Sequence, residues 1–277
     1  MKILLTGAAG QLGRSLRRTL HGHDVVACEH GRLDIADLAA VREAVAAEKP
    51  DLILNAAAHN RVDDAESDPG PAYRGNAVGP RNLALASNEV GAAVVHVSTD
   101  YVFDGRGNRP YHEYDVPAPR SAYGASKLAG EVAVREANPR HYIARTAWVY
   151  HEERGNFPRT MLSLRDRDEV RVVNDQVGSP TYAPHLADAL TTLIETEAFG
   201  TYHLAGAGQA SWFDLTCELY RREGITTSVV PVTTEEFPRP AERPQFSVLE
   251  TVQEPRIVLP AWQDGLAAFC TRLHRAA

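Results

Sequence analysis

The sequence contains little cysteine and has no excess of positive charge. Its three cysteines, Cys28, Cys217 and Cys270, lie far apart and never in Cys-x-x-Cys spacing, which favours a reduced, cytoplasmic protein. The formal net charge is −7 over 277 residues. The densest basic runs fall in amphipathic helical patterns, where a solvated face is the ordinary interpretation. A nucleic-acid partner is therefore not expected.

Long hydrophobic runs and metal-ligand clusters are also missing. No apolar stretch approaches the roughly 20 residues that a membrane-spanning helix needs. The opening MKILLTGAAGQLG has a lysine and a short apolar run, but its glycines come too early for a signal-peptide core. The histidines are scattered, without carboxylates or cysteines at ligand spacing. We therefore expect no membrane association and no bound metal.

Short apolar runs alternate with helical patterns through the first half of the chain. The patterns predict strands at 2–6, 25–28, 51–57, 93–99 and 142–148, and helices at 12–20, 37–47, 73–90 and 121–136. Such alternation is typical of an α/β protein with a doubly wound parallel sheet of the Rossmann type. We therefore expect a dinucleotide-binding domain in residues 1–148.

After Trp148 the regular alternation of predicted strands and helices ends. Proline-rich segments lie around 180–184 and 237–244, and helical patterns lie near 184–196, 212–223 and 262–274. We expect residues 149–277 to form mainly a smaller substrate-binding lobe, with part of 170–200 returning to the first domain. The stretch 233–244 is expected to be an active-site loop.

A glycine-rich loop follows the first predicted strand. Gly7, Gly10 and Gly13 open the first strand–helix unit, where small residues let the backbone approach a pyrophosphate and the helix N-terminus offers free amides. The second glycine comes three residues after the first, rather than two as in the usual dinucleotide motif. The loop therefore predicts a nucleotide site, and a tight turn without a ligand is the alternative.

The second predicted strand ends near residues that could select the cofactor. Glu29 could bond the ribose hydroxyls of NAD and repel the extra phosphate of NADP, whereas Arg32 could receive that phosphate. The sequence therefore does not decide between NADH and NADPH as the cofactor. Asp34 and Ile35 could flank the adenine, although Asp34 could equally be a turn or cap residue.

Tyr123 and Lys127 lie four positions apart in a predicted helix, one turn from each other on the same face. The lysine charge is expected to lower the pKa of the phenol and make it a better acid. Taken alone, the pair would be an ordinary exposed helix pair. Thr99 ends a predicted strand at the carboxyl edge of the sheet, where its hydroxyl could reach a substrate carbonyl. The combination predicts carbonyl reduction or oxidation with a nicotinamide nucleotide.

Several segments resemble one family. GAAGQLG, NAAAHNRVDDAE, VSTDYVFDG, YGASKLAGE, RTAWVY, NDQVGSPTY and RPQFSVL are similar to motifs of the extended short-chain dehydrogenase/reductases, and within them of the dTDP-4-dehydrorhamnose reductases. The resemblance implies a catalytic group of Thr99, Tyr123 and Lys127. The implied cofactor contacts, beside Tyr123, Lys127 and the residues already named, are Gly7, Gly10, Gln11, Leu12, Gly13, Ala56, Ala57 and Ala58. The implied substrate contacts are Asp100, Tyr101, Trp148 and Arg243, with a core position as the alternative for Trp148.

The resemblance also implies a reaction. Hydride passes from NADPH or NADH to carbon 4 of a dTDP-4-keto-6-deoxyhexose while Tyr123 protonates the oxygen. Two alternatives remain: a reductase of another nucleotide-linked keto sugar on an antibiotic or glycan pathway, and a non-catalytic regulatory subunit of methionine adenosyltransferase. Related dehydratases carry a glutamate where Tyr101 stands, so dehydration is disfavoured.

Two departures from the family pattern concern assembly. Ser15 and Pro184 stand where some members carry glutamates that hold magnesium at a dimer interface. We therefore expect a metal-free protein that is a monomer or a weak dimer.

Overall fold

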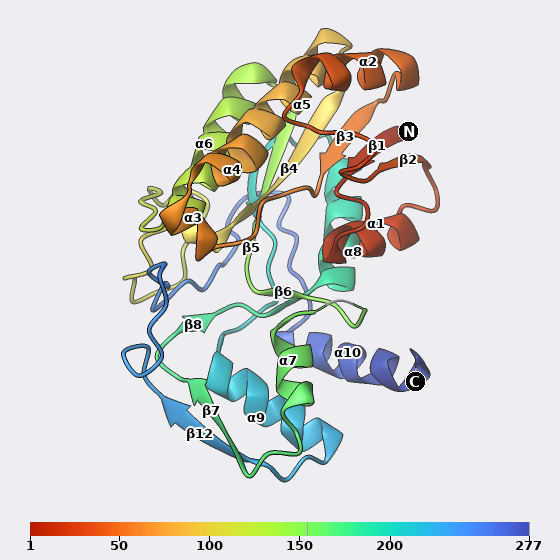
Figure 1. Cartoon of the computed structure of the whole chain (residues 1–277). Coiled ribbons are helices and arrows are strands. Elements are labelled where there is room, and N and C mark those ends of the chain that lie inside the picture. The colour runs from red at the N-terminus through yellow and green to blue at the C-terminus, as the bar shows by residue number, and fades with distance from the viewer. Residues whose placement is uncertain (154, 277) are drawn as a thin grey trace.

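A six-stranded, wholly parallel sheet forms the centre of the molecule (Figure 1). The structure is a computed structural model, and it describes residues 1–153 and 155–276. The strand order is β10-β5-β4-β3-β1-β2. The strands are β1 (Lys2–Thr6), β2 (Asp24–Cys28), β3 (Leu52–Asn55), β4 (Ala93–Thr99), β5 (His141–Thr146) and β10 (Gly200–His203). The chain leaves β1 toward β2 and returns to β3 on the other side of β1. This reversal is the point where open α/β sheets bind ligands, and the predicted doubly wound fold is confirmed.

Helices cover both faces because successive residues of a buried strand point to opposite sides. Ile3 and Leu5 lie in one apolar core, which α1 (Gln11–Thr19) and α8 (Ala183–Ile194) close. Leu4 lies in a second core, which α2 (Leu38–Glu48), α5 (Gly79–Glu89) and α6 (Ala122–Ala137) close. Figure 1 shows these two helix layers on either side of the sheet.

The helix predicted at 73–90 begins earlier and is not regular. It runs through α4 (Gly70–Tyr73), a π-helical segment η1 (Arg74–Val78) and α5, and the short helix α3 (Asp64–Ser67) precedes it. Asn76 in η1 is fully buried. Its side chain accepts a hydrogen bond from His59 N and donates one to His59 O, at 2.8 and 3.0 Å. A π-helical turn often marks a functional region, and this one faces α6.

The strand predicted at 142–148 ends early. Its last residue is Thr146, and Trp148 has a left-handed backbone with φ of 48°. The strand predicted at 51–57 likewise covers only β3, because Asn55 ends it by accepting a hydrogen bond from Ala57 N at 3.1 Å. In both places the chain leaves the sheet at its carboxyl edge, toward the ligand crevice.

A smaller lobe lies below the sheet in Figure 1. Its helices are α7 (Phe157–Ser163), α9 (Trp212–Glu223) and α10 (Trp262–Ala276). Three two-stranded pairs complete it: β7 (Glu169–Val173) with β12 (Ser228–Val232), β8 (Val177–Gly178) with β11 (Ala210–Ser211), and β6 (Val149–Tyr150) with β9 (Thr181–Tyr182). Side chains of all three helices share its apolar core, among them Met161, Leu219 and Phe269.

The chain returns to the sheet after visiting this lobe. Helix α8 packs on α1, and β10 pairs in parallel with β5 at the edge of the sheet. The strand β10 was not among the predicted strands, because its Gly-Thr-Tyr-His sequence is short and weakly apolar. Among the described residues, no helix is both long and apolar enough to span a bilayer.

Candidate active site

The glycine loop forms the floor of a cavity of about 520 Å³ at the reversal of the sheet. Gly7 has φ of 69°, and a Cβ there would lie 2.5 Å from the backbone of Ala56 and Ala57. A Cβ on Gly13 would lie 2.2 Å from the carbonyl oxygen of Gly7. Glycine is required at both positions because strand β3 and helix α1 approach the loop so closely. Gly10 is the N-cap of α1, so the free amides of that helix open beside the cavity.

Eight of the predicted cofactor residues line this cavity: Gly7, Gly10, Glu29, Asp34, Ile35, Ala56, Ala57 and Ala58. The other six predicted cofactor residues do not: Gln11, Leu12, Gly13, Arg32, Tyr123 and Lys127. Leu12 is buried in the sheet core, and Gln11 accepts a hydrogen bond of 3.0 Å from Asn156 of the lower lobe. The Arg32 guanidinium donates to the carbonyl of Ala27 at 3.2 Å, away from the cavity.

A different arginine reaches the cavity. Arg74, in the π-helical segment, lines it and forms a 2.7 Å ion pair with Asp34. Together with the backbone amide of Ala36, this contact lowers the pKa of the Asp34 carboxyl. Sequence reasoning missed Arg74 because it lies 40 positions from Asp34, and no local motif marks it.

Thr99, Tyr123 and Lys127 come together at the carboxyl end of β4. Thr99 is the last residue of that strand, and Tyr123 and Lys127 lie on the buried face of α6. Ser121 caps α6 by accepting from Gly124 N at 3.1 Å, which fixes the start of the helix just before Tyr123. The Tyr123 ring packs edge-on against Tyr101, with 5.5 Å between ring centroids.

The pKa of Tyr123 differs from the expectation. It is raised above the ordinary tyrosine value, first by burial and then by the nearby charge of Asp100, while hydrogen bonding with Thr99 acts in the opposite direction. The expected lowering by Lys127 is therefore wrong for this arrangement. The lysine Nζ instead donates a 2.6 Å hydrogen bond to the carbonyl oxygen of Val97. The phenol thus carries its proton at neutral pH, as a proton donor must.

The pKa of Lys127 is also shifted from its ordinary value. Its side chain is 2% exposed, and burial lowers its pKa to about 8, against the opposing charge of Glu131. The carboxylate of Glu131 is buried as well and forms a bidentate pair with Arg145, at 2.9 and 2.7 Å. The buried face of α6 therefore holds an ammonium group that gains or loses its proton close to physiological pH.

Asp100 is a fully enclosed carboxyl group next to Thr99. Its Oδ1 accepts from the Thr99 hydroxyl at 2.8 Å, and its Oδ2 accepts from the Ser247 hydroxyl at 2.6 Å. Burial raises its pKa to about 6, although these hydrogen bonds lower it. Ser247 was not predicted as a site residue, although it lies in the RPQFSVL motif.

The remaining predicted substrate residues lie around this centre. Arg243 forms a 2.9 Å ion pair with Asp63, and it lines a small cavity together with Tyr101. The Ala241 amide also donates to Asp63, at 3.2 Å, so the loop 233–244 is joined to the start of α3. Trp148 is half-buried, and its ring stacks on Trp212.

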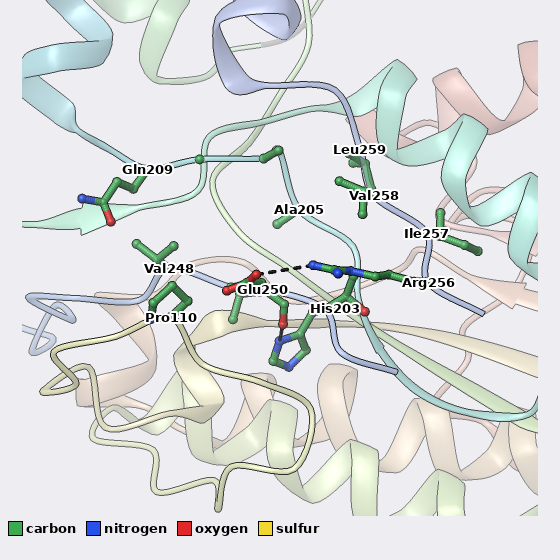
Figure 2. A pocket seen from close by; sticks show the side chains of 14 residues that line it. Pro110, His203, Ala205, Gln209, Val248, Glu250, Arg256, Ile257, Val258 and Leu259 are labelled. Atoms are coloured by element: carbon green, nitrogen blue, oxygen red, sulfur yellow. Dashed lines mark hydrogen bonds and ion pairs between the residues drawn. The ribbon is translucent and has the colours of Figure 1, made fainter. Parts of the chain in front are cut away.

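Two further cavities lie elsewhere, and like the cavities above they are not lined by Thr99, Tyr123 or Lys127. One of about 800 Å³ lies between residues 104–107 and the loop 233–244, and Arg106, Arg239 and Arg243 are among its lining residues. The other, of about 310 Å³, lies beside β10 and the C-terminal segment (Figure 2). Figure 2 shows Glu250 and Arg256 paired across it, 3.4 Å apart, above the buried His203.

A parallel sheet with a glycine-lined cavity at its reversal, and a buried Tyr and Lys at the carboxyl end of β4, defines a Rossmann-type oxidoreductase. The family model described as "RmlD substrate binding domain" matches residues 1–275. The chain belongs to this family, within the extended short-chain dehydrogenase/reductases.

Curated relatives and solved structures agree with this assignment. The dTDP-4-dehydrorhamnose reductase of Salmonella typhimurium is 41% identical, over 99% of this chain and 98% of its own length. A probable dTDP-4,6-dihydroxy-2-methyloxan-3-one 4-ketoreductase of Streptomyces antibioticus is 43% identical, over 90% and 86%. The crystal structure of the Bacillus anthracis dTDP-4-dehydrorhamnose reductase with NADP has a TM-score of 0.95 and 39% identity, over 98% of this chain and 99% of its own. A dTDP-4-dehydrorhamnose reductase from Clostridium acetobutylicum has a TM-score of 0.97 and 43% identity, over 99% and 100%.

Proposed function

We propose that the protein reduces the 4-keto group of a dTDP-4-keto-6-deoxyhexose with NADPH or NADH. The observation that carries the proposal is the grouping of Thr99, Tyr123 and Lys127 at the carboxyl end of β4, on the same edge of the sheet as the cavity that the glycine loop lines. The names of relatives that match almost the whole chain support the same substrate class.

The cavity residues fit a nicotinamide dinucleotide. The loop from Gly7 to Gly13 presents backbone rather than side chains, and a Cβ on Gly10 would already approach the Gly7 carbonyl oxygen to 3.1 Å. Backbone amides at the start of α1 suit a pyrophosphate. Glu29 and Arg74 line the same cavity, one suited to ribose hydroxyls and the other to a phosphate, so we propose that either nucleotide can be used. When bound, the nucleotide supplies the hydride.

The residues of the chain supply the proton and hold the carbonyl group. Tyr123 is protonated at neutral pH because burial raises its pKa, so it can give its proton to the oxygen formed at carbon 4. The Thr99 hydroxyl lies beside it and can donate a hydrogen bond to the same oxygen. Lys127 provides a positive charge below about pH 8, which stabilises negative charge that develops on the oxygen. Asp100, Tyr101, Trp148 and Arg243 are proposed to contact the sugar nucleotide.

A second candidate is a reductase of a different dTDP-linked keto sugar. The Streptomyces antibioticus relative, named as a probable 4-ketoreductase of another dTDP sugar, favours it. Both candidates share the catalytic group and differ only in the sugar substituents that the lower lobe must accept.

A substrate panel tests the proposal. Purified protein is mixed with NADPH or NADH and with dTDP- and UDP-linked 4-keto sugars, cofactor oxidation is followed by absorbance, and products are identified by NMR. We expect reduction at carbon 4 with dTDP-4-keto-6-deoxyhexoses. A protein that oxidises neither nucleotide with any 4-keto sugar would contradict the proposal, and preference for a different dTDP sugar would favour the second candidate.

We also propose a cytoplasmic monomer or weak dimer. Among the described residues the three cysteines are all free, which suits a reducing compartment. Ser15 is a buried residue of α1, and Pro184 lies in the first turn of α8; neither side chain has a carboxylate to offer a metal-linked interface. Sedimentation equilibrium with and without magnesium would test this assembly.

A further inference from the structure

Trp148 and Trp212 form a closely overlapping pair of indoles. Their ring centroids are 3.5 Å apart and their planes differ by 4°. Aromatic pairs in proteins usually sit with centroids 4.5–7 Å apart, offset or edge-on. Rings that overlap this fully need other contacts to hold them in place.

The position of Trp148 makes this pair relevant to the reaction. Thr146 is the register partner of Thr99 in the sheet, and Trp148 follows only two residues later, at the same carboxyl edge. Its backbone is left-handed, a conformation that costs a tryptophan energy and persists only where the surroundings impose it. A Cβ on Gly178 would lie 2.6 Å from the Trp148 ring, so β8 crowds this indole as well.

Trp212 is anchored independently of Trp148. It is the first residue of α9, whose start is fixed by a capping box between Ser211 and Asp214. Its indole Nε1 donates to Gln176 Oε1 at 3.2 Å, and Phe157 packs on it with 4.4 Å between centroids. The Gln176 amide in turn donates to the Thr234 hydroxyl at 3.0 Å, which joins the pair to the start of the loop 233–244.

We propose that Trp212 is a positioning residue for the reductase reaction: it holds the Trp148 indole at the carboxyl edge of the sheet, just after β5, and Gln176 fixes the orientation of Trp212. The inference rests on the proposed function, because the role given to Trp148 is contact with the sugar nucleotide. Trp212 itself need not touch the substrate. The link through Gln176 and Thr234 also ties the indole pair to the loop that carries Arg243.

Indole NMR tests the pair without relying on catalysis. The chain has three tryptophans, so protein with labelled indole nitrogens should give three indole N–H signals. Trp148→Phe and Trp262→Phe assign them. In Trp212→Leu, the Trp148 signal should move to lower field because the shielding by the stacked ring is lost, while the Trp262 signal stays in place. An unmoved Trp148 signal would overturn the inference.

Kinetics then test the positioning role. Trp212→Leu should raise the KM for the sugar nucleotide about tenfold, while the KM for NAD(P)H changes by less than about twofold. Trp212→Phe keeps a stacking ring and should recover much of the loss, and Gln176→Leu should fall between the two. Trp262→Phe, in the core of the lower lobe, is the matched control and should keep both KM values.

The outcomes separate this inference from the proposed function. A wild-type protein that reduces no 4-keto sugar would overturn both. An active wild-type protein with an unchanged sugar-nucleotide KM in Trp212→Leu would leave the function standing and overturn the role of Trp212. Equal rises of both KM values would also overturn it, because they would indicate a general loss of structure.

Discussion

The Ser247 hydroxyl donates a 2.6 Å hydrogen bond to Asp100 Oδ2, across 147 positions of sequence. The bond joins the C-terminal segment to the end of β4, where the proposed catalytic group lies. Asp100 also accepts from Thr99, and its charge acts on the Tyr123 phenol. A serine outside the predicted site therefore influences the electrostatics of the proposed proton donor.

Ser247→Ala should change the acid side of the pH profile. The hydrogen bond from Ser247 lowers the Asp100 pKa, which burial has raised to about 6, so its removal should raise that pKa further. If ionised Asp100 is needed, the acid limb of kcat/KM should move about one unit to higher pH. Asp100→Asn should remove this limb, and a Ser247→Ala profile that superimposes on that of the wild type would contradict the assignment.

Tyr123→Phe should lower kcat by roughly 10²–10⁴, the usual range for loss of a general acid, while NAD(P)H affinity stays the same. The phenyl ring can keep the edge-on contact with Tyr101. Single-turnover kinetics would measure the chemical step, and nucleotide titration would serve as the control. A variant that keeps more than about a tenth of the wild-type rate would exclude Tyr123 as the proton donor.

Lys127→Met should remove the basic limb of the profile. The lysine pKa of about 8 lies below its ordinary value, so the ammonium loses its proton as the pH rises through 8, and wild-type activity should fall there. The methionine variant should be slow throughout and flat between about pH 7 and 9. Lys127→Arg, which stays charged, should shift this limb to higher pH. A basic limb that survives in Lys127→Met would assign it to another group.

Gly10→Val and Gly13→Ala should differ in whether they impair nucleotide binding alone or stability as well. Gly10 faces the cavity, so a valine should block nucleotide binding while the melting temperature changes little. A Cβ on Gly13 would collide with the Gly7 carbonyl oxygen, so the alanine should lower both the melting temperature and nucleotide affinity. Gly22→Ala is the control, because nothing lies within 4 Å of its added Cβ. Normal NADPH titration of Gly10→Val would mean that the loop is only a turn.

Arg243→Ala should raise the KM for the sugar nucleotide about tenfold, because the guanidinium is proposed to contact that substrate. Asp63→Asn separates this role from the Arg243–Asp63 ion pair. It should loosen the loop 233–244 but leave the guanidinium available, so its KM should rise less. Initial rates at varied concentrations of both substrates measure the effect. Equal KM values in the two variants would show that the Arg243–Asp63 ion pair, rather than a contact between Arg243 and the substrate, determines the KM for the sugar nucleotide.

The sequence was most informative where apolar periodicity and local motifs act together. The strand at 93–99 was predicted at its observed bounds because a buried parallel strand is a continuous apolar run. The helix containing Tyr123 and Lys127 was predicted at 121–136 from its helical pattern, close to the observed Ala122–Ala137. These elements form because of residues that are close together in the sequence, so one sequence is enough to predict them.

Features that depend on distant residues could not be predicted. Arg74 replaces Arg32 at the cavity only because the helix from Gly70 passes over Asp34. The raised pKa of Tyr123 reflects burial, which spacing on a helix does not reveal. Trp148 was expected in a strand, but its backbone is left-handed and its ring stacks on Trp212, which lies 64 positions later in the chain.

Helix α8 has a consequence for how the chain is made. Its leucines Leu186, Leu190 and Leu193 share a core with Leu12 and Leu16 of α1, so the face of the sheet covered by α1 stays partly open until α8 has been synthesised. During translation, that apolar face stays partly uncovered from the end of β5 at Thr146 until α8, which begins at Ala183, has been made. We therefore expect that residues 1–148 alone would not form a stable free-standing module for fusion proteins.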